Sequence, residues 1–241
     1  MTTAKRTKIG FVTNSTGWGA HYDAFLAIVP RELDVQIETL ELYSESLAEL
    51  KDKGDEHVAR TSALAKERGW QAVALMGAPA EVQNVDFLKR EQAAIDVPVT
   101  TALTSGSAAL KAFGVRRALL LTPFEPWLND LLVAHLKTLG VEAQLRAGAF
   151  ESVAEARALT PEQVHDLAIA SFRAADGAEA IYFQGAPFNP LDVIEPIEAV
   201  LDVPVIASNP AMLWHAVSLV GERHPVQGHG RLLAEWPALA G

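Results

Sequence analysis

The sequence contains the same short pattern twice, QAVALMGAP at residues 71–79 and EAIYFQGAP at residues 179–187. Each copy is followed by DVPV, at 96–99 and again at 202–205, then by a short polar stretch and an amphipathic segment. Four matched features in matched order indicate an internal duplication. The duplication predicts two similar units, 1–114 and 115–241, with a helix at 210–221 that crosses back onto the first unit.

Each repeated segment is typical of a buried parallel strand that ends in a tight turn. Gly77 and Gly185 end the two apolar runs. Glycine allows a sharp turn and a close approach of the backbone to a ligand. In open α/β sheets, ligands bind beyond the carboxyl ends of the strands. We therefore expect the two turns to face one shared cleft, although a single copy on its own would more often be a simple way to end a strand.

Further apolar runs and helical periods alternate along the chain without a long linker. The additional strands are expected at 8–13, 35–42, 97–101, 115–122, 141–145 and 203–207. The helices are expected at 22–29, 44–68, 84–95, 105–113, 128–139, 160–174 and 212–220. This order predicts an α/β protein of two pseudo-symmetric halves, each a parallel sheet flanked by helices, with the cleft between them. Thr160 and Gln163 form a capping-box pattern, and the tail after Gly221 is expected to be irregular.

Composition excludes several classes of chemistry and partner. The 241 residues include 49% apolar residues, enough for one large or two small domains. The sequence has no apolar run of about 18 residues and no signal-like start, which predicts a cytoplasmic protein without a membrane span. A net charge of −10 argues against nucleic acid as a partner, but backbone amides still hold small anions in an acidic protein. The absence of cysteine excludes disulfides and thiol nucleophiles.

Several of these segments resemble the aspartate/glutamate racemase superfamily, and most closely its branch of arylmalonate decarboxylase and maleate cis-trans isomerase. The similar segments are VALMG at 73–77, TT at 100–101, GVRR at 114–117, VPV at 203–205, and Pro210 followed by Trp214. The resemblance covers about residues 7–221. It implies two flavodoxin-like halves, a cofactor-independent isomerase or lyase for a small carboxylic acid, and a homodimer as one assembly state.

The chain departs from this family at the residues that carry its chemistry. Members of the family place a cysteine at the end of one or both symmetric strands, and these positions correspond to Gly77 and Gly185. The hydroxyl donors beside the first position correspond to Ala78 and Pro79, and a tyrosine of the same anion pocket corresponds to Phe124. Asn14 and the backbone amides near the two glycines remain as groups that hold an anion. Thiol-dependent proton transfer is therefore impossible in this chain.

Without thiols, proton transfer falls to carboxylate, imidazole, phenol or amine groups. The candidate catalytic residues are Glu81 just past the first turn, Gln184 just before the second, and His215 on the helix after the last strand. Each has a structural alternative. The alternative for Glu81 is an interaction with a helix dipole, for Gln184 it is the satisfaction of buried backbone groups, and for His215 it is a half-exposed surface position.

The candidate substrate-binding residues gather at the predicted carboxyl ends of the strands. They are Asn14, Gly77, Ala78, Thr101, Phe124, Tyr182, Gly185, Ala186 and Asn209. The side chains of Thr101 and Asn209 either bind substrate oxygens or cap the following helices. Glu125 either enters the cleft or stays solvated. His224 and His229 have no evident third ligand, so no metal site is expected.

These observations favour an enzyme that acts on a small carboxylic acid without a cysteine acid/base or a cofactor. Two alternatives are a catalytically inactive paralogue that binds a small carboxylate and a hydrolase that acts on a bulkier substrate. The cleft distinguishes the three hypotheses. A small polar cavity favours the first, a cleft filled by side chains the second, and an enlarged apolar cavity the third.

Overall fold

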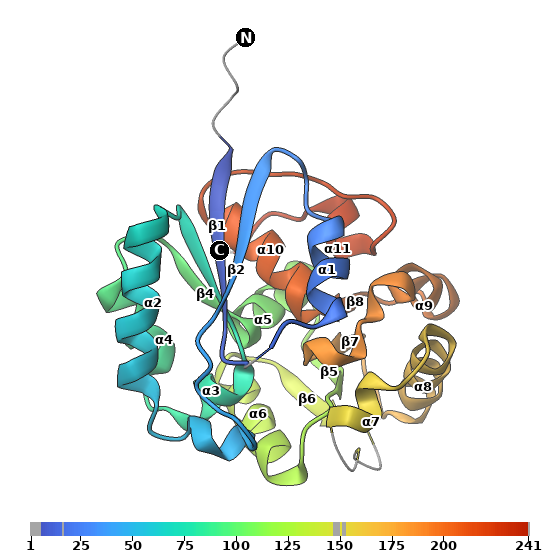
Figure 1. Ribbon diagram of the computed structural model, residues 1–241. Helices are drawn as coiled ribbons and strands as arrows, with labels where there is room; N and C mark the ends of the chain where they lie inside the picture. Colours follow the sequence, from blue (N-terminus) through green and yellow to red (C-terminus); the bar gives the residue numbers. More distant parts are fainter. Residues whose placement is uncertain (1–5, 16, 147–149, 151–152, 241) are drawn as a thin grey trace.

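The computed structural model describes the chain except residues 1–5, 16, 147–149, 151–152 and 241. Its strands form two four-stranded parallel sheets (Figure 1). The first sheet has the order β2-β1-β3-β4, with strands β1 (Thr7–Thr13), β2 (Leu33–Thr39), β3 (Ala72–Met76) and β4 (Val99–Thr101). The second has the order β6-β5-β7-β8, with strands β5 (Arg117–Leu121), β6 (Glu142–Leu145), β7 (Ala180–Phe183) and β8 (Val205–Ala207). The identical strand order confirms the predicted α/β fold of two similar halves.

Helices flank both sheets. Those that follow strands of the first sheet are α1 (Ala20–Ala27), η1 (Leu47–Leu50), α2 (Gly54–Arg68), α3 (Ala78–Gln83), α4 (Phe87–Ala94) and α5 (Ala102–Ala112). Those that follow strands of the second are α6 (Pro126–Thr138), α7 (Val153–Arg157), α8 (Pro161–Ala174), η2 (Ala186–Phe188), η3 (Pro190–Asp192), α9 (Ile194–Leu201), α10 (Ser208–Leu219) and α11 (Arg231–Glu235). No helix in the described ranges is long and apolar enough to cross a membrane.

The two repeated apolar runs form β3 and β7. Each lies between two other strands, and every residue of both is buried. Helices cover both faces of a parallel sheet, so its central strands are apolar throughout instead of alternating. This explains why the duplication is visible in the sequence as two continuous apolar runs.

Helices α5 and α10 join the two halves (Figure 1). They pack against each other, and α10 also contacts β3 and β4 of the first sheet and β8 of the second. Ten consecutive residues of α10, 208–217, are buried. Trp214 in this helix is fully buried, and its indole Nε1 donates to the carbonyl oxygen of Pro237 at 3.0 Å. One continuous hydrophobic core therefore includes residues of both sheets.

Helix boundaries differ from the expected ones where a side chain competes with the helix. The helix expected at 84–95 begins only at Phe87, as α4, because Asn84 binds backbone groups and Asp86 is left-handed at φ +51°. The short helix α3 precedes it and was not expected. The helix expected at 44–68 begins only at Gly54, after the short helix η1. The tail expected to be irregular contains α11, whose Leu232 and Leu233 are buried. The predicted capping box of Thr160 and Gln163 is confirmed.

A tyrosine of the second sheet is hydrogen-bonded to the first half. Tyr182 on β7 is fully buried, and its hydroxyl donates to the carbonyl oxygen of Ala102 at the start of α5, at 2.9 Å. The hydroxyl also lies 2.5 Å from Oε1 of Gln184. Gly106 on α5 has no side chain where this tyrosine passes, and a Cβ there would overlap its ring.

We expect Tyr182→Phe to lower the free energy of unfolding by about 1–3 kcal/mol, because it leaves buried acceptors without a donor. Gly106→Ala should cost more, since the added methyl group collides with the fixed ring. Urea denaturation measures both changes. Tyr43→Phe is the matched control, because no described residue is hydrogen-bonded to that hydroxyl. A Tyr182→Phe protein as stable as this control would contradict the assigned role.

Candidate functional site

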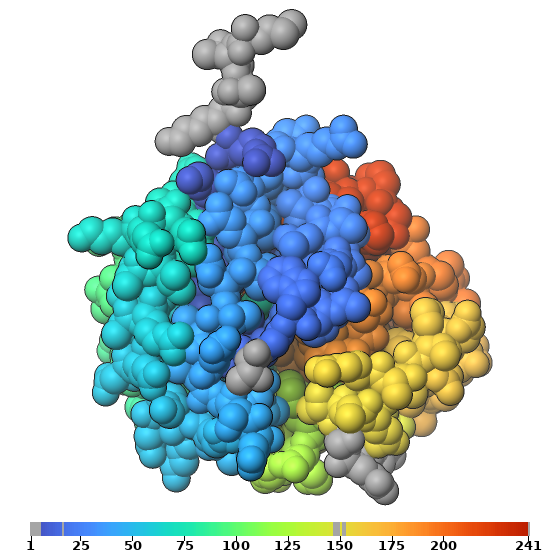
Figure 2. All heavy atoms as spheres, in the orientation of Figure 1, coloured from blue at the N-terminus to red at the C-terminus, as the bar shows by residue number. Residues whose placement is uncertain are grey.

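A cavity of about 430 Å³ lies at the carboxyl ends of the central strands of both sheets. It is lined by the loop after β1, the turns after β3 and β7, and the first residues of α5 and α10. Residues 43–47 and helix α7 complete its rim. Figure 2 shows the face of the molecule where the first half (blue) meets α7 (yellow). The cavity therefore forms where the two repeats come together.

Gly77 and Gly185 occupy matched positions in this cavity. Their backbone φ angles are +119° and +124°, values that residues with an L side chain rarely adopt. A Cβ atom at Gly77 would lie 2.7 Å from Nδ2 of Asn14, and one at Gly185 would lie 2.6 Å from Cδ of Pro123. Any side chain at either position, a thiol included, therefore requires its neighbours to move.

We expect Gly185→Ala to destabilise the protein by about 2–4 kcal/mol, from the backbone conformation and from overpacking against a rigid proline ring. Gly77→Ala should cost less, because the amide of Asn14 can rotate away. Gly221→Ala is the control for conformation alone, since its φ is +78° and a Cβ there meets nothing within 4 Å. Thermal and urea unfolding measure the three changes. Equal losses at Gly185 and Gly221 would exclude crowding by Pro123.

Asn14 brings an unpaired amide to the cavity. Its side chain is 3% exposed, and neither Oδ1 nor Nδ2 has a hydrogen-bond partner among the described residues. The backbone is fixed by Leu42, whose N–H donates to the carbonyl oxygen of Asn14 at 3.2 Å. A buried amide without a partner costs about 1–3 kcal/mol. An amide kept in this state beside a cavity is suited to bind a polar ligand.

Most of the predicted site residues line this one cavity. They are Asn14, Gly77, Ala78, Phe124, Gln184, Gly185, Ala186 and Asn209. Gln184 is buried, and its Oε1 is held by Tyr182, which lies behind the cavity wall. Burial raises the pKa of Tyr182 well above its ordinary value, so this phenol stays protonated. The place of Gln184 agrees with a ligand-binding role, and its role in catalysis stays a prediction.

Glu81 and Thr101 lie outside the cavity and contact each other. Thr101 caps α5 by accepting from the N–H of Thr104 at 3.0 Å, and its hydroxyl donates to Oε1 of Glu81 at 2.8 Å. The same carboxylate oxygen lies 3.2 Å from Nε2 of His135 on α6. Glu81 and His135 line a separate cavity of about 520 Å³. The first turn of α3 thus presents Ala78 and Pro79 to the cleft and directs Glu81 toward α6.

His215 also lies outside the cleft, inside the α5–α10 junction. Its Nδ1 is 2.7 Å from the hydroxyl oxygen of Thr100 and 3.3 Å from that of Ser105. The residue is 8% exposed, so the half-exposed surface position considered as its alternative is wrong. Burial lowers the pKa of His215 to about 4. The imidazole is neutral near pH 7 and joins β4 to α10.

The lowered pKa of His215 predicts a pH-dependent stability. The unfolded chain binds a proton below pH 6.5, whereas the folded state binds it only near pH 4. The free energy of unfolding should therefore fall as the pH drops from about 6.5 to 4, by about 3 kcal/mol for this residue. Urea denaturation at several pH values measures the slope. His215→Asn should make the slope shallower, whereas His165→Gln on α8 should leave it unchanged. An unchanged slope in His215→Asn would refute the assignment.

Tyr22, Tyr43 and Glu45 line the cavity without having been predicted from the sequence, and so do two residues that carry or can carry a positive charge. They are His21 in the first turn of α1 and Arg157 at the end of α7. Arg157 is the only Lys or Arg among the described residues that line the cavity. The place of His21 could have been inferred from the strand–loop–helix order after β1. Arg157 had no such signal, because α7 was not recognised.

Two remaining candidates, Glu125 and His224, make hydrogen bonds or ion pairs outside the cavity. Glu125 is exposed, accepts from Nε1 of Trp127 at 2.6 Å and does not line the cleft. His224 pairs with Glu222 at 2.8 Å. In the described part of the chain, no three His, Cys, Asp or Glu residues are grouped as metal ligands.

Comparison with known proteins identifies the family. The arylmalonate decarboxylase family model matches residues 29–233. The chain belongs to the arylmalonate decarboxylase family. It is 30% identical over 177 residues to arylmalonate decarboxylase of Bordetella bronchiseptica, covering 70% of this chain and 74% of that protein. This result confirms the resemblance inferred from the sequence.

Solved structures agree with this assignment. A doubly substituted arylmalonate decarboxylase in a liganded form superposes with a TM-score of 0.82 at 26% identity, over 95% of this chain and 99% of that chain. The maleate isomerase of Pseudomonas putida S16 has the same fold, with a TM-score of 0.78 at 19% identity over 96% and 100% of the two chains. The prediction of an enzyme of the lyase or isomerase type is confirmed at the level of the family.

Proposed function

We propose that this protein is a cofactor-independent lyase or isomerase that acts on a small carboxylic acid with an apolar substituent and uses no cysteine. The observation that carries the proposal is the unpaired Asn14 amide beside the Gly77 turn, in a cavity that Gly185 also lines. The family relationship supports the same reaction class, because a relative that is 30% identical is named arylmalonate decarboxylase. A homodimer stays a prediction.

Local electrostatics support an anionic substrate. The first residues of α10, Ser208 and Asn209, line the cavity, and the N-cap of this helix provides no side-chain hydrogen bond. Free N–H groups at a helix N-terminus attract negative charge. Arg157 adds a full positive charge at the rim. The cavity is therefore suited to a carboxylate, although the protein as a whole carries a charge of −10.

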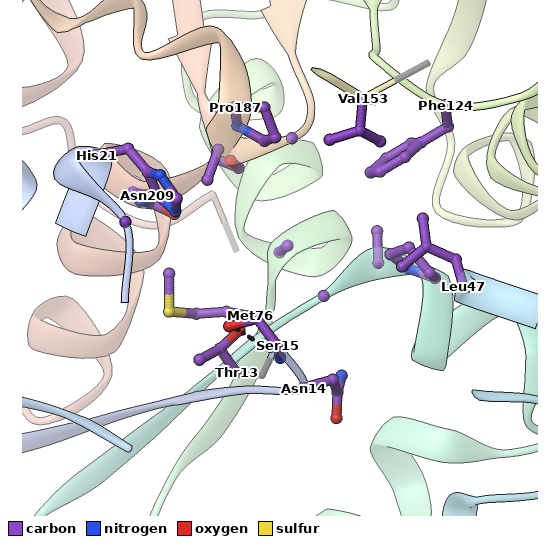
Figure 3. Close-up of a pocket in the computed structure, with 18 of the residues that line it drawn as sticks. Thr13, Asn14, Ser15, His21, Leu47, Met76, Phe124, Val153, Pro187 and Asn209 are labelled. Atoms are coloured by element: carbon purple, nitrogen blue, oxygen red, sulfur yellow. Dashed lines mark hydrogen bonds between the residues drawn. The ribbon is translucent and has the colours of Figure 1, made fainter. Parts of the chain in front are cut away.

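One wall of the cavity is apolar. Leu47, Phe124 and Val153 lie on the side away from His21 and Asn209, and Asn14 lies with Thr13 and Ser15 below (Figure 3). A substrate held at its carboxylate would place an aryl or alkyl group against the apolar wall. A volume of about 430 Å³ accommodates such an acid. Substituted malonates are therefore the first substrates to test.

The polar groups of the cavity would act on a charge that develops during the reaction. Loss of carbon dioxide or of an α-proton leaves an enediolate on the substrate. Donors that are already oriented toward this charge stabilise the transition state more than the ground state. The Asn14 amide and the free N–H groups of α10 would supply these donors in the absence of the family's hydroxyl groups.

Proton NMR in D₂O with a panel of mono- and dicarboxylates, aryl-substituted malonates included, tests the proposal. We expect saturation transfer together with α-deuteration or product formation for at least one acid. Asn14→Ala should lower kcat/KM by about 10–100-fold, the value of a hydrogen bond to a charged group. Arg157→Gln should mainly raise KM, whereas Arg173→Gln on α8 should change neither constant.

The other outcomes distinguish the alternatives. An Asn14→Ala protein with an unchanged rate would refute the role of this amide. Binding without exchange or turnover would favour an inactive carboxylate-binding paralogue. Cleavage of ester or amide substrates would favour the hydrolase. The absence of binding by any acid in the panel would exclude a small carboxylate as the ligand.

A further inference from the structure

The proposed reaction needs a group that exchanges a proton with the substrate, and the cavity offers few. Among the described residues that line it, the groups that titrate are His21, Tyr22, Tyr43 and Glu45, besides the arginine. The hydroxyl of Tyr22 is engaged with the hydroxyl oxygens of Thr13 at 3.1 Å and Ser15 at 3.2 Å. Burial raises the pKa of Tyr43, and Glu45 is exposed at the rim.

His21 is the group that lies next to a symmetric glycine turn. It lines the main cavity and an adjoining recess of about 20 Å³, which it shares with Gly185, Ala186, Ser208 and Asn209. The recess is about the size of one water molecule, so these residues lie close together. Figure 3 shows His21 and Asn209 on one side of the cavity, with Asn14 below and Leu47 opposite. A substrate held by Asn14 therefore presents one face to the imidazole.

The imidazole ring is held in place by its neighbours. Its centroid lies 4.1 Å from that of the Tyr22 ring. Gly19, the N-cap of α1, has ordinary extended angles of φ −125° and ψ 151°. A Cβ on Gly19 would nevertheless lie only 2.7 Å from Nδ1 of His21. The backbone angles at this position do not require glycine. Glycine is needed there because a larger residue would overlap the imidazole ring.

We propose that His21 is the catalytic acid of this cavity. For a malonate, the bond between the α-carbon and the departing carboxyl group breaks, carbon dioxide leaves, and the electron pair remains on the substrate as an enediolate. The protonated imidazole then transfers its N–H proton to the α-carbon, where a C–H bond forms. The neutral imidazole regains a proton from water. This inference rests on the proposed function and names the residue that replaces a thiol in it.

The charges around His21 couple its protonation to substrate binding. Burial and then the nearby Arg157 lower its pKa to about 4, and Asp23 on the same helix opposes them. Tyr22 adjoins the ring, and Tyr43 and Glu45 are the other titrating groups of the cavity. A bound carboxylate adds negative charge and neutralises the effect of Arg157, which raises the pKa of the imidazole. The imidazole of the complex therefore holds a proton more readily than that of the free enzyme.

The test measures kcat and KM across pH for the wild-type protein, His21→Gln and His165→Gln, on whichever acid of the panel the wild-type protein turns over. We expect His21→Gln to lower kcat about 100-fold or more with KM within threefold, as for other acid catalysts. The wild-type kcat should decline as the pH rises, because the acid must be protonated, and this decline should vanish in His21→Gln. His165→Gln should behave as the wild type.

Gly19→Ala tests the role of His21 without removing its imidazole, because the added methyl group would displace the ring. It should lower kcat in the wild-type background and have no further effect in His21→Gln, because both changes act through one ring. A loss below tenfold in His21→Gln, or a pH dependence that persists in it, would overturn the proposal. A wild-type protein that turns over no acid would refute the proposed function itself, and the assignment of His21 with it. If the wild-type protein is active and His21→Gln is equally active, only the assignment of His21 is refuted.

Discussion

The shape of the site depends on two glycines whose backbone conformation other residues rarely adopt. Gly77 and Gly185 end the central strands of the two sheets with φ near +120°. Because neither carries a side chain, the Asn14 amide packs directly on the first turn and Pro123 on the second. The cavity between the sheets exists in its present form because both turns stay bare, and a side chain at either turn would require Asn14 or Pro123 to move.

Several buried polar residues join the two halves of this protein. Tyr182 binds the start of α5, His215 binds Thr100 across the α5–α10 junction, and Glu81 lies between Thr101 and His135. Hydrogen bonds of this kind are strong in a low-dielectric interior, and they are costly when a partner is missing. They fix the relative position of the two sheets, on which the shape of the shared cavity depends.

The distribution of charge reconciles an acidic protein with an anionic substrate. The carboxylates that give the chain its charge of −10 lie largely on exposed helix faces and loops. Only Glu45, itself exposed, brings a carboxylate to the cavity, in the part of the chain that the structure describes. Arg157 and the start of α10 oppose it. Charge near a bound ligand, and not the net charge, decides which ligand a site accepts.

The sequence by itself determined the duplication, the sheet-forming runs and the two glycine turns, because these features depend on local patterns of two to nine residues. Tertiary structure decided which side chains share the cavity. Glu81 follows the first glycine turn in sequence and His215 follows the end of β8, but the rotation of α3 and α10 directs both side chains away from the cavity. His21 and Arg157 reach the cavity from α1 and α7, in different halves. Their approach depends on how the two sheets pack, and no local pattern encodes that packing.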